Sequence, residues 1–422
     1  MRVLKRNRWL TGLALLLAVL VVHGGRALAD VVPTTNDPGS IVIFPKVIAN
    51  GTRDTLIQLT NTSNMPAQAH CIYVNGTGQC SLTGGQCVRA NVTNLGSPDC
   101  PPLPPPNTNN LAHEDCLQTC TERNFDIFLT AQQPTVWRVS TGRRVDSTDA
   151  FRGFDPGRIL PVTPDFQGEL KCIQTMAIQG EEEKSDANSL KGEAVLETIS
   201  TGEISEYNAI AILAHTDGSL DPLSPILDIG GEYYPCPGGP DALWINHYSD
   251  GAADALFSGA TVHTELTLVP CSEDLEDGAP MPSKAHFQAV TDQELPCVSA
   301  DVKFNCYFNG LLGDIEVGAD ACGSQFLKTS LSTGGNPSGT SGKVCFSGDN
   351  FGQPCPNGNS DCPNATLPNL GCRLPPGLLG IVEEFHTTSG QAVAEGGTAA
   401  ANLHVGNTRA GDLIIPPSTL TP

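Results

Sequence analysis

Two histidine–glutamate patterns in the second half of the chain have the residue types that metal binding or acid–base chemistry needs. His263 and Glu265 are two residues apart, as are Glu384 and His386. Side chains two positions apart lie on the same face of a strand, so each pair places an imidazole beside a carboxylate. With His247, these four residues are candidate ligands of a metal ion or members of an acid–base cluster. The alternative is an ordinary solvent-exposed strand face, and we expect both pairs to face solvent.

A second pattern combines histidine with cysteine. A short helix predicted over residues 111–123, with Asn110 as its N-cap, places His113, Cys116 and Cys120 on one face. Such a set is typical of zinc in a reducing compartment, whereas cysteines form disulfides in an oxidising one. The choice between zinc and disulfides therefore depends on where the protein resides.

The start of the chain predicts export. A basic beginning precedes an apolar run of ten residues at 13–22 and a small-x-small cleavage site at 27–29, directly before Asp30. Residues 1–29 are therefore predicted to be a signal peptide, because the run is too short to cross a bilayer. All sixteen cysteines follow this leader, and their even number favours disulfides. We expect a periplasmic, cell-surface or extracellular protein.

The charge of the chain limits its partners. The formal net charge is −22, and it becomes more negative once the basic leader is removed. Nucleic acid and anionic membranes attract positive surfaces, so neither is expected to bind. No later apolar run is long enough to span a membrane, and the expected partner is a protein or a glycan at the cell surface. Oxygen-rich loops at 217–218, 277–278 and 347–350 leave calcium as the alternative to having no cofactor, although none follows the twelve-residue calcium pattern.

Composition and periodicity predict an all-β chain. Glycine (44 residues) and proline (33 residues) are spread along the sequence, and only 16% of residues are charged. Short alternating runs separated by turn-forming residues are typical of β-sandwiches. The expected strands are 41–48, 55–60, 67–74, 125–130, 136–140, 167–176, 192–199, 207–213, 242–248, 261–269, 286–290, 302–308, 325–328, 378–386 and 398–405.

These strands suit two antiparallel sandwiches of about seven strands each. The predicted domains are 30–235 and 236–422. Each domain carries a cysteine-rich loop insertion, at 75–124 in the first and at 331–377 in the second. Loops of this length and composition need disulfides to hold one conformation.

Strand parity predicts one buried disulfide. Alternation places Cys71 and Cys172 on the apolar faces of their strands, with Glu169 and Lys171 on the opposite, polar face. Inward cysteines from facing sheets about 10 Å apart form an inter-sheet bridge. Cys71 is therefore predicted to pair with Cys172 across the sandwich, with Trp137 packed beside the bridge.

Five segments share one strand-and-turn form. Residues 54–63 (D-T-L-I-Q-L-T-N-T-S) run from a strand into an Asn/Ser turn, and 125–130 and 166–170 fit the same module. Residues 264–269 and 379–382 repeat it in diverged form. In these segments the chain resembles the Ig-like β-sandwich modules of exported bacterial surface proteins. The resemblance implies two Ig-like antiparallel sandwiches, and it carries over no catalytic residue.

The remaining cysteines fall into groups. Cys345, Cys355, Cys362 and Cys372 lie in a segment with few apolar residues and are expected to pair among themselves, in one of three ways. Ten others form two odd groups, one in the first insertion and one mid-chain: Cys80, Cys87, Cys100, Cys116 and Cys120; Cys236, Cys271, Cys297, Cys306 and Cys322. Two odd groups cannot both close internally. Either one disulfide joins the first insertion to the second half, or each group leaves a free thiol.

The sequence holds none of the standard catalytic motifs. It has no G-x-S-x-G elbow, no H-E-x-x-H zinc motif, no Walker loop and no dinucleotide-binding glycine pattern after a strand. We therefore expect a secreted, non-enzymatic structural or interaction protein of the cell surface or extracellular space, with its loops as contact surfaces. A secreted carbohydrate-active hydrolase using loop carboxylates and a calcium-dependent envelope module are the alternatives.

Overall fold

The computed structural model describes an all-β protein. It describes residues 33–80, 116–118, 120–143, 157–178, 181–215, 229, 233–234, 236–238, 242–254, 259–271, 283–291, 295–304, 306–316, 322–333, 344–345, 355, 358–363, 372–373, 377–387 and 398–405. All of these belong to one compact unit, Val32–Pro422. No helix within these ranges has the length and apolarity needed to cross a membrane. The predicted signal peptide lies outside them.

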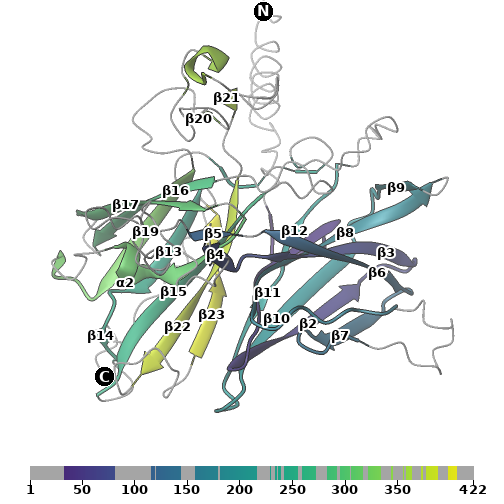
Figure 1. Cartoon of the computed structure of the whole chain (residues 1–422), viewed down its shortest axis with the longest axis horizontal. Helices are drawn as coiled ribbons and strands as arrows, with labels where there is room; N and C mark the ends of the chain where they lie inside the picture. The colour runs from purple at the N-terminus through teal and green to yellow at the C-terminus, as the bar shows by residue number, and fades with distance from the viewer. Residues whose placement is uncertain are drawn as a thin grey trace, which may run out of the picture. The chain divides into compact units, whose positions relative to one another are not determined.

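The first half of the chain forms one ten-stranded antiparallel sheet (Figure 1). Its order is β11-β10-β2-β1-β8-β3-β6, with β12 paired to β1, β7 to β2 and β9 to β8. The strands are β1 (Ile41–Ala49), β2 (Arg53–Asn61), β3 (Ala67–Asn75), β6 (Thr121–Leu129), β7 (Pro134–Arg138), β8 (Phe166–Ile178), β9 (Glu181–Lys184), β10 (Leu190–Thr198), β11 (Ile204–Asn208) and β12 (Ile210–Ile212). β1 pairs with β2 where Ala49 is opposite Asp54, and further along it pairs with β8 and β12 instead. The sheet thus divides into two sets of strands at the β1–β2 turn.

The two sets of strands enclose one core. Apolar side chains of β1, β3, β6 and β8 form a single buried cluster with those of β2, β7 and β10. The alternation of side chains along each strand directs every second one into this core. In β10, for example, every second residue from Leu190 to Leu196 is buried. Within this core the Trp137 indole N–H donates to the Tyr73 hydroxyl at 2.7 Å. The pair ties β7 to β3 across the cluster.

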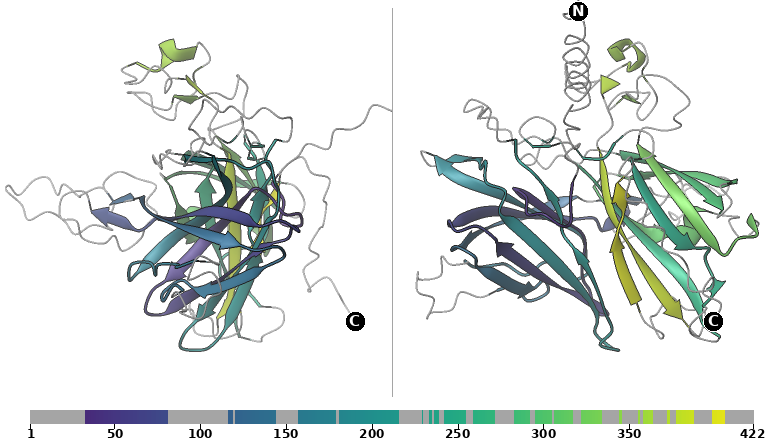
Figure 2. Two further views of the ribbon diagram at one scale, coloured as in Figure 1. Left: turned by 90° about the vertical axis from the view of Figure 1, so that its right-hand side faces the viewer. Right: turned by 180° about the vertical axis from the view of Figure 1, so that it is seen from behind.

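The second half forms two five-stranded sheets around another core (Figure 2). One has the order β17-β16-β19-β13-β24, and the other has β14-β15-β22-β23 with β18 paired to β15. The strands are β13 (Leu243–Tyr248), β14 (Ala252–Ala253), β15 (Thr261–Pro270), β16 (Ser283–Thr291), β17 (Pro296–Phe304), β18 (Phe308–Leu311), β19 (Phe326–Thr333), β22 (Leu378–Thr387), β23 (Thr398–Asn402) and β24 (His404–Val405). Phe287 and Leu331 of the first sheet and Leu266 of the second belong to one buried cluster. The remaining described elements are β4 (Gly78–Cys80), β5 (Cys116–Gln118), β20 (Val344–Cys345), β21 (Cys372–Arg373), the helical turn α2 (Leu312–Ile315) and the 3-10 turn η2 (Gly358–Asp361).

A third apolar layer joins the two halves. Ile43, Ile72 and Ile173, on the outer face of β1, β3 and β8, share a buried cluster with Val269 and Leu379 of the second half. This double coverage explains why every residue of β1 is buried. The division of the chain at residue 235 into two Ig-like sandwiches stays a prediction.

Each of the fifteen expected strands overlaps an observed one, but three of them are each two strands. The expected strand 207–213 is β11 and β12, which pair with β10 and β1 of the same sheet. The expected strands 302–308 and 398–405 are β17 with β18 and β23 with β24, and in each case the two strands belong to different sheets. The helix expected over 111–123 is wrong, because Cys116–Gln118 forms β5 and Thr121–Leu129 forms β6 beside β3. Pairing with β3 outweighs the weak local preference for a helix. His113 and Asn110 lie outside the described residues.

The Cys71–Cys172 disulfide is present, but within one sheet. Cys71 on β3 is directly opposite Cys172 on β8, and their Cα atoms are 4.1 Å apart. Opposed antiparallel residues that do not hydrogen-bond to each other have the closest Cα atoms, which suits a bridge between neighbouring strands. The expected inter-sheet geometry is therefore wrong, whereas Trp137 lies in the same core cluster as the bridge.

A second disulfide joins the first insertion to the second half. Cys120, directly before β6, pairs with Cys306, between β17 and β18, across a sequence separation of 186. This is the first of the two outcomes that the odd cysteine groups allow. The other members of the mid-chain group pair as Cys236–Cys271 and Cys297–Cys322.

The C-terminal cysteine group is described in part. The β20–β21 register places Cys345 opposite Cys372. Cys355 and Cys362 are each disulfide-bonded. How the four pair stays a prediction, and residues 81–115 of the first insertion lie outside the described ranges.

Candidate functional site

The four predicted metal ligands share one sheet but occupy its opposite faces. The β15–β22 register places Thr264 opposite Glu384. Directly opposed residues share a face and successive residues alternate, so His263 and Glu265 face away from Glu384 and His386. The two pairs therefore cannot surround one ion, and the strand faces that carry them are not ordinary solvent faces.

Each of these histidines is bound to an aspartate. His263 Nδ1 lies 2.7 Å from Asp250 Oδ1, and His386 Nδ1 contacts Asp254 Oδ2. His247 belongs to β13, in the other five-stranded sheet. Within the described part of the chain, no group of three or more His, Cys, Asp or Glu side chains is arranged to hold a metal ion. The three predicted calcium loops lie outside that part.

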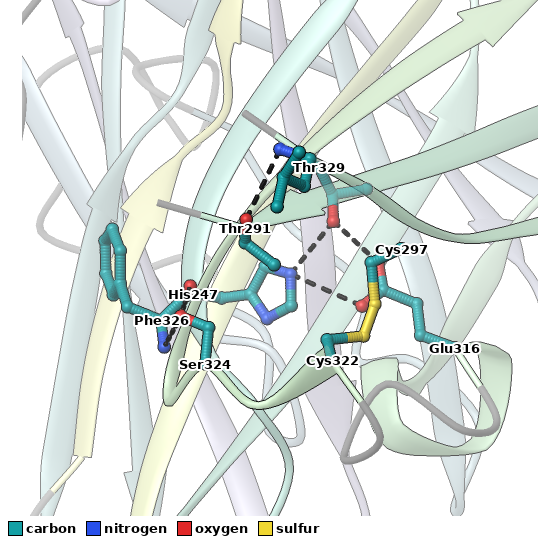
Figure 3. The surroundings of a disulfide bond; sticks show 9 residues. His247, Thr291, Cys297, Glu316, Cys322, Ser324, Phe326 and Thr329 are labelled. Carbon is teal, nitrogen blue, oxygen red and sulfur yellow. Dashed lines mark hydrogen bonds and ion pairs between the residues drawn. A yellow bond between two sulfur atoms is a disulfide. The ribbon is translucent and has the colours of Figure 1, made fainter. Parts of the chain in front are cut away.

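His247 belongs to a buried polar network beside the second-half disulfide drawn in Figure 3. Its Nδ1 is 2.8 Å from the Tyr248 carbonyl oxygen, and its Nε2 is 2.9 Å from the Thr329 hydroxyl. Thr329 donates to Glu316 at 2.6 Å, and the Glu316 carboxylate lies 3.5 Å from Nε2. Both ring nitrogens are thus engaged inside the protein, so this histidine joins β13 and β19 to the end of α2.

Among the residues that the structure describes, the largest group of buried charges lies between the two halves of the chain. Lys46 Nζ contacts Glu265 Oε2 and lies 2.8 Å from Glu383 Oε2. The Arg53 guanidinium contacts Glu383 Oε1. The side chains of Lys46 and Glu383 are 0% exposed, so neither charge is balanced by water. We call these four residues the interface charge cluster.

A β-bulge directs the side chain of Lys46 toward the second half of the chain. The β1–β8 register shifts between Phe44 and Val47, and bulges redirect the side chains that they contain. Pro45 has no N–H to donate to the ladder at this point. The Tyr207 hydroxyl accepts from the Lys46 N–H at 3.1 Å and donates to the Lys46 carbonyl oxygen at 2.5 Å. Both backbone polar groups of Lys46 at the bulge therefore have a hydrogen-bond partner, and the buried Tyr207 side chain holds the bulge in its conformation.

Glu383 stays ionised because two cations surround it. Burial alone raises the pKa of this carboxyl, but Lys46 and Arg53 outweigh burial and lower the pKa to about 2. Ser205 donates to the same carboxylate at 2.7 Å. The Arg53 guanidinium also lies over the Phe385 ring, 5.6 Å from its centroid. A buried ion left without its partner costs about 3 to 5 kcal/mol, so these contacts fix how the halves pack together.

Glu265 extends the cluster to a carboxamide. Its Oε1 accepts from the Asn309 Nδ2 at 2.6 Å, while its Oε2 contacts Lys46. The Thr267 hydroxyl donates to the Asn309 Oδ1 at 2.6 Å. One carboxylate thus touches an amine and an amide nitrogen at the same time.

Two further charges were expected on a polar face and are buried. Glu169 is fully buried, and Lys171 Nζ lies 3.0 Å from its Oε1. Burial raises the pKa of Glu169, and Lys171 opposes that effect. The alternation of β8 was assigned correctly, but the second half covers the face that carries these residues.

Lys46, Arg53 and Glu383 were not identified from the sequence. A signal was present for the first, because Lys46 is the single charged residue in the otherwise apolar β1 sequence I-V-I-F-P-K-V-I-A. A lone lysine inside a fully buried strand requires a buried partner.

No protein-family model matches the chain, and no curated protein sequence matches it. The resemblance to Ig-like surface modules therefore stays an interpretation of the sequence.

Proposed function

We propose that the chain is an exported, non-enzymatic structural or interaction protein of the cell surface or extracellular space. The Cys120–Cys306 disulfide is the observation that carries this proposal. A bridge between such distant segments persists in oxidising compartments, whereas cytosolic thiols are kept reduced. The wide sequence separation also makes the bridge effective in restricting the unfolded chain.

The interface charge cluster supports a structural role. Two cations, Lys46 and Arg53, and two carboxylates, Glu265 and Glu383, neutralise one another between the two halves. With the third apolar layer and the disulfide, they make a rigid support on which loops can present a contact surface to a protein or glycan. Strands of the ten-stranded sheet end at Ile212 and those of the five-stranded sheets begin at Leu243, which is compatible with two Ig-like modules.

Secretion of the full-length chain from a bacterial host, followed by cell fractionation, tests the location. We expect a shortened chain beginning near Asp30 in the periplasm, on the surface or in the medium. A full-length chain in the cytoplasm with free thiols would overturn the proposal.

Incubation of the oxidised protein with a panel of polysaccharides tests the absence of catalysis. We expect no release of reducing sugar. A polysaccharide that raises Tm without being cleaved would identify a glycan partner, because a ligand stabilises the folded state by mass action. Cleavage would replace the proposal with the hydrolase alternative, and a calcium-dependent rise in Tm would favour the envelope-module alternative.

A further inference from the structure

Aromatic and amide side chains share the outer face of one sheet in the second half. Every second residue of β13 is buried, and Trp244, Asn246 and Tyr248 between them are partly exposed. Phe326 and Lys328 of β19 are directly opposite Tyr248 and Asn246, so they share this face. The aromatic face, as we call it, consists of Trp244, Asn246, Tyr248, Gln288, Phe326 and Lys328.

We propose that the aromatic face binds a polysaccharide whose sugars carry carboxylate groups. The inference rests on the proposed function, since it gives the interaction protein a ligand of stated chemistry and a site.

The sheet that carries the aromatic face is an outer layer of the second half. Its inner face packs against Leu266 and Leu268 of β15. The opposite face of β15 meets the first half, through Val269 in the third apolar layer and through Glu265 beside Lys46. The aromatic face therefore points away from the first half.

Side-chain contacts hold the groups of the aromatic face in place. The Tyr248 and Phe326 rings pack edge to face, with centroids 5.8 Å apart and an interplanar angle of 81°. Lys328 Nζ lies over the Trp244 ring, 4.3 Å from its centroid. Such contacts stabilise one arrangement of the side chains, so less conformational entropy is lost when a ligand binds.

These side chains fit the chemistry of a sugar. A sugar ring has apolar C–H faces and a rim of hydroxyl groups. Aromatic rings pack against the apolar faces, and the carboxamides of Asn246 and Gln288 can both donate to and accept from hydroxyl groups. Gln288 is opposite Ser330, and Ser330 is opposite Trp244, so an amide and an indole flank one serine.

The spacing of the aromatic groups favours a chain of sugars. Trp244 and Tyr248 are four residues apart in β13, which corresponds to about 13 Å along the strand. A ligand that contacts both must be extended, with polar contacts to Asn246 between them.

The same order of groups disfavours a protein as the ligand. The centre of a protein interface is apolar and depleted of charge. Here Asn246 and the exposed Lys328 lie between the indole and the two rings at the other end.

Local charge favours a carboxylated ligand. Lys328 is exposed, and it forms no ion pair within the part of the chain that the structure describes. Asp301 of the same sheet already has a partner, because its Oδ1 lies 2.8 Å from His286 Nδ1. The net charge of −22 belongs to the whole chain, and charges beyond about 8 Å are largely screened at physiological salt. A sugar carboxylate therefore complements the ammonium of Lys328.

Titration calorimetry of the exported, oxidised protein with polygalacturonate, alginate and neutral dextran tests the proposal. We expect binding to a carboxylated polysaccharide, with an affinity that falls as the salt concentration rises, and no binding to dextran. No binding to either carboxylated polymer would overturn the proposal, and so would equal binding to dextran. Binding to intact cells that disappears after protease treatment, with no binding to the polymers, would assign the face to a protein and overturn it as well.

Variants locate the site. We expect Trp244→Ala and Lys328→Gln each to weaken binding by about tenfold, and Lys328→Gln also to remove most of the salt dependence. Phe128→Ala is the matched control, because Phe128 is an aromatic residue of the first half that is 38% exposed, and it should bind as the parent does. Unchanged affinity in Lys328→Gln would overturn the proposal, and this exposed position decides even if Trp244→Ala fails to fold.

Export and binding are separate readouts. An exported chain that binds neither carboxylated polymer would overturn this inference and leave the proposed function standing. A chain that binds them but stays in the cytoplasm with free thiols would overturn the proposed function and support the site.

Discussion

Replacing Glu383 with glutamine removes the carboxylate that Lys46 and Arg53 share and preserves its volume. These two cations hold the pKa of Glu383 at about 2, against an ordinary value of 4.5. Because one pKa unit corresponds to about 1.4 kcal/mol, the ionised carboxylate contributes about 3 kcal/mol to the free energy of unfolding at neutral pH. We expect Glu383→Gln to lose about that amount.

The loss should depend on pH in a defined direction. A carboxyl whose pKa is lower in the folded state stabilises the fold fully above its ordinary pKa of 4.5. That contribution disappears as the pH falls through the folded value of about 2. The difference in stability between the parent and Glu383→Gln should therefore shrink across this acidic range.

Urea denaturation at a series of pH values measures this difference. Glu384→Gln is the matched control: it is the next residue on the opposite face, and burial raises its pKa with only partial opposition from His386. A glutamate with a raised pKa costs stability when ionised, so this variant should keep or gain stability at neutral pH. A loss in Glu383→Gln that does not change with pH, or an equal loss in Glu384→Gln, would refute the reasoning.

Two further changes test the packing and the disulfides by the free energy of unfolding in urea. Cys71→Ala with Cys172→Ala opens a loop with a sequence separation of 101, and it should lower this free energy by about 5 kcal/mol; an unchanged value would mean that the bridge does not form. Gly76→Ala places a Cβ against the ring of Tyr307, and it should cost about 2 kcal/mol because that ring is fully buried. Gly51→Ala, whose Cβ would meet open space, is the control and should change little.

Local pattern was sufficient to place the strands. Alternation of apolar and polar residues is a property of a few neighbouring positions, and it located all fifteen expected strands. The same parity placed Cys71 and Cys172 on inward faces. Parity does not say which strands are neighbours, so it could not distinguish a bridge within the sheet from a bridge between sheets.

Burial of charge was not accessible from local pattern. Glu169 and Lys171 alternate with apolar residues, as they would on a solvent-exposed face. They are buried because chain from the distant second half covers β8, and coverage of that kind is a long-range property. The partners of Lys46 lie more than two hundred residues away, at Glu265 and Glu383, so a lysine in an apolar strand indicated a buried partner without identifying it.

The interruption of one expected strand also has a tertiary cause. Apolar and polar residues alternate without a break over 302–308, yet β17 ends at Phe304, before Cys306, which forms a disulfide with Cys120. Cys120 itself has a φ of 45°, in the left-handed region that most residues avoid. Both deviations occur where a disulfide joins the first insertion to the second half.

Peptide mapping of the exported protein without reduction tests most directly whether a disulfide joins its two halves. After alkylation of free thiols and digestion, we expect a linked pair of peptides that contains Cys120 and Cys306, with no label on either residue. Labelled Cys120 and Cys306, or disulfides confined to the first insertion and to the second half separately, would contradict this architecture.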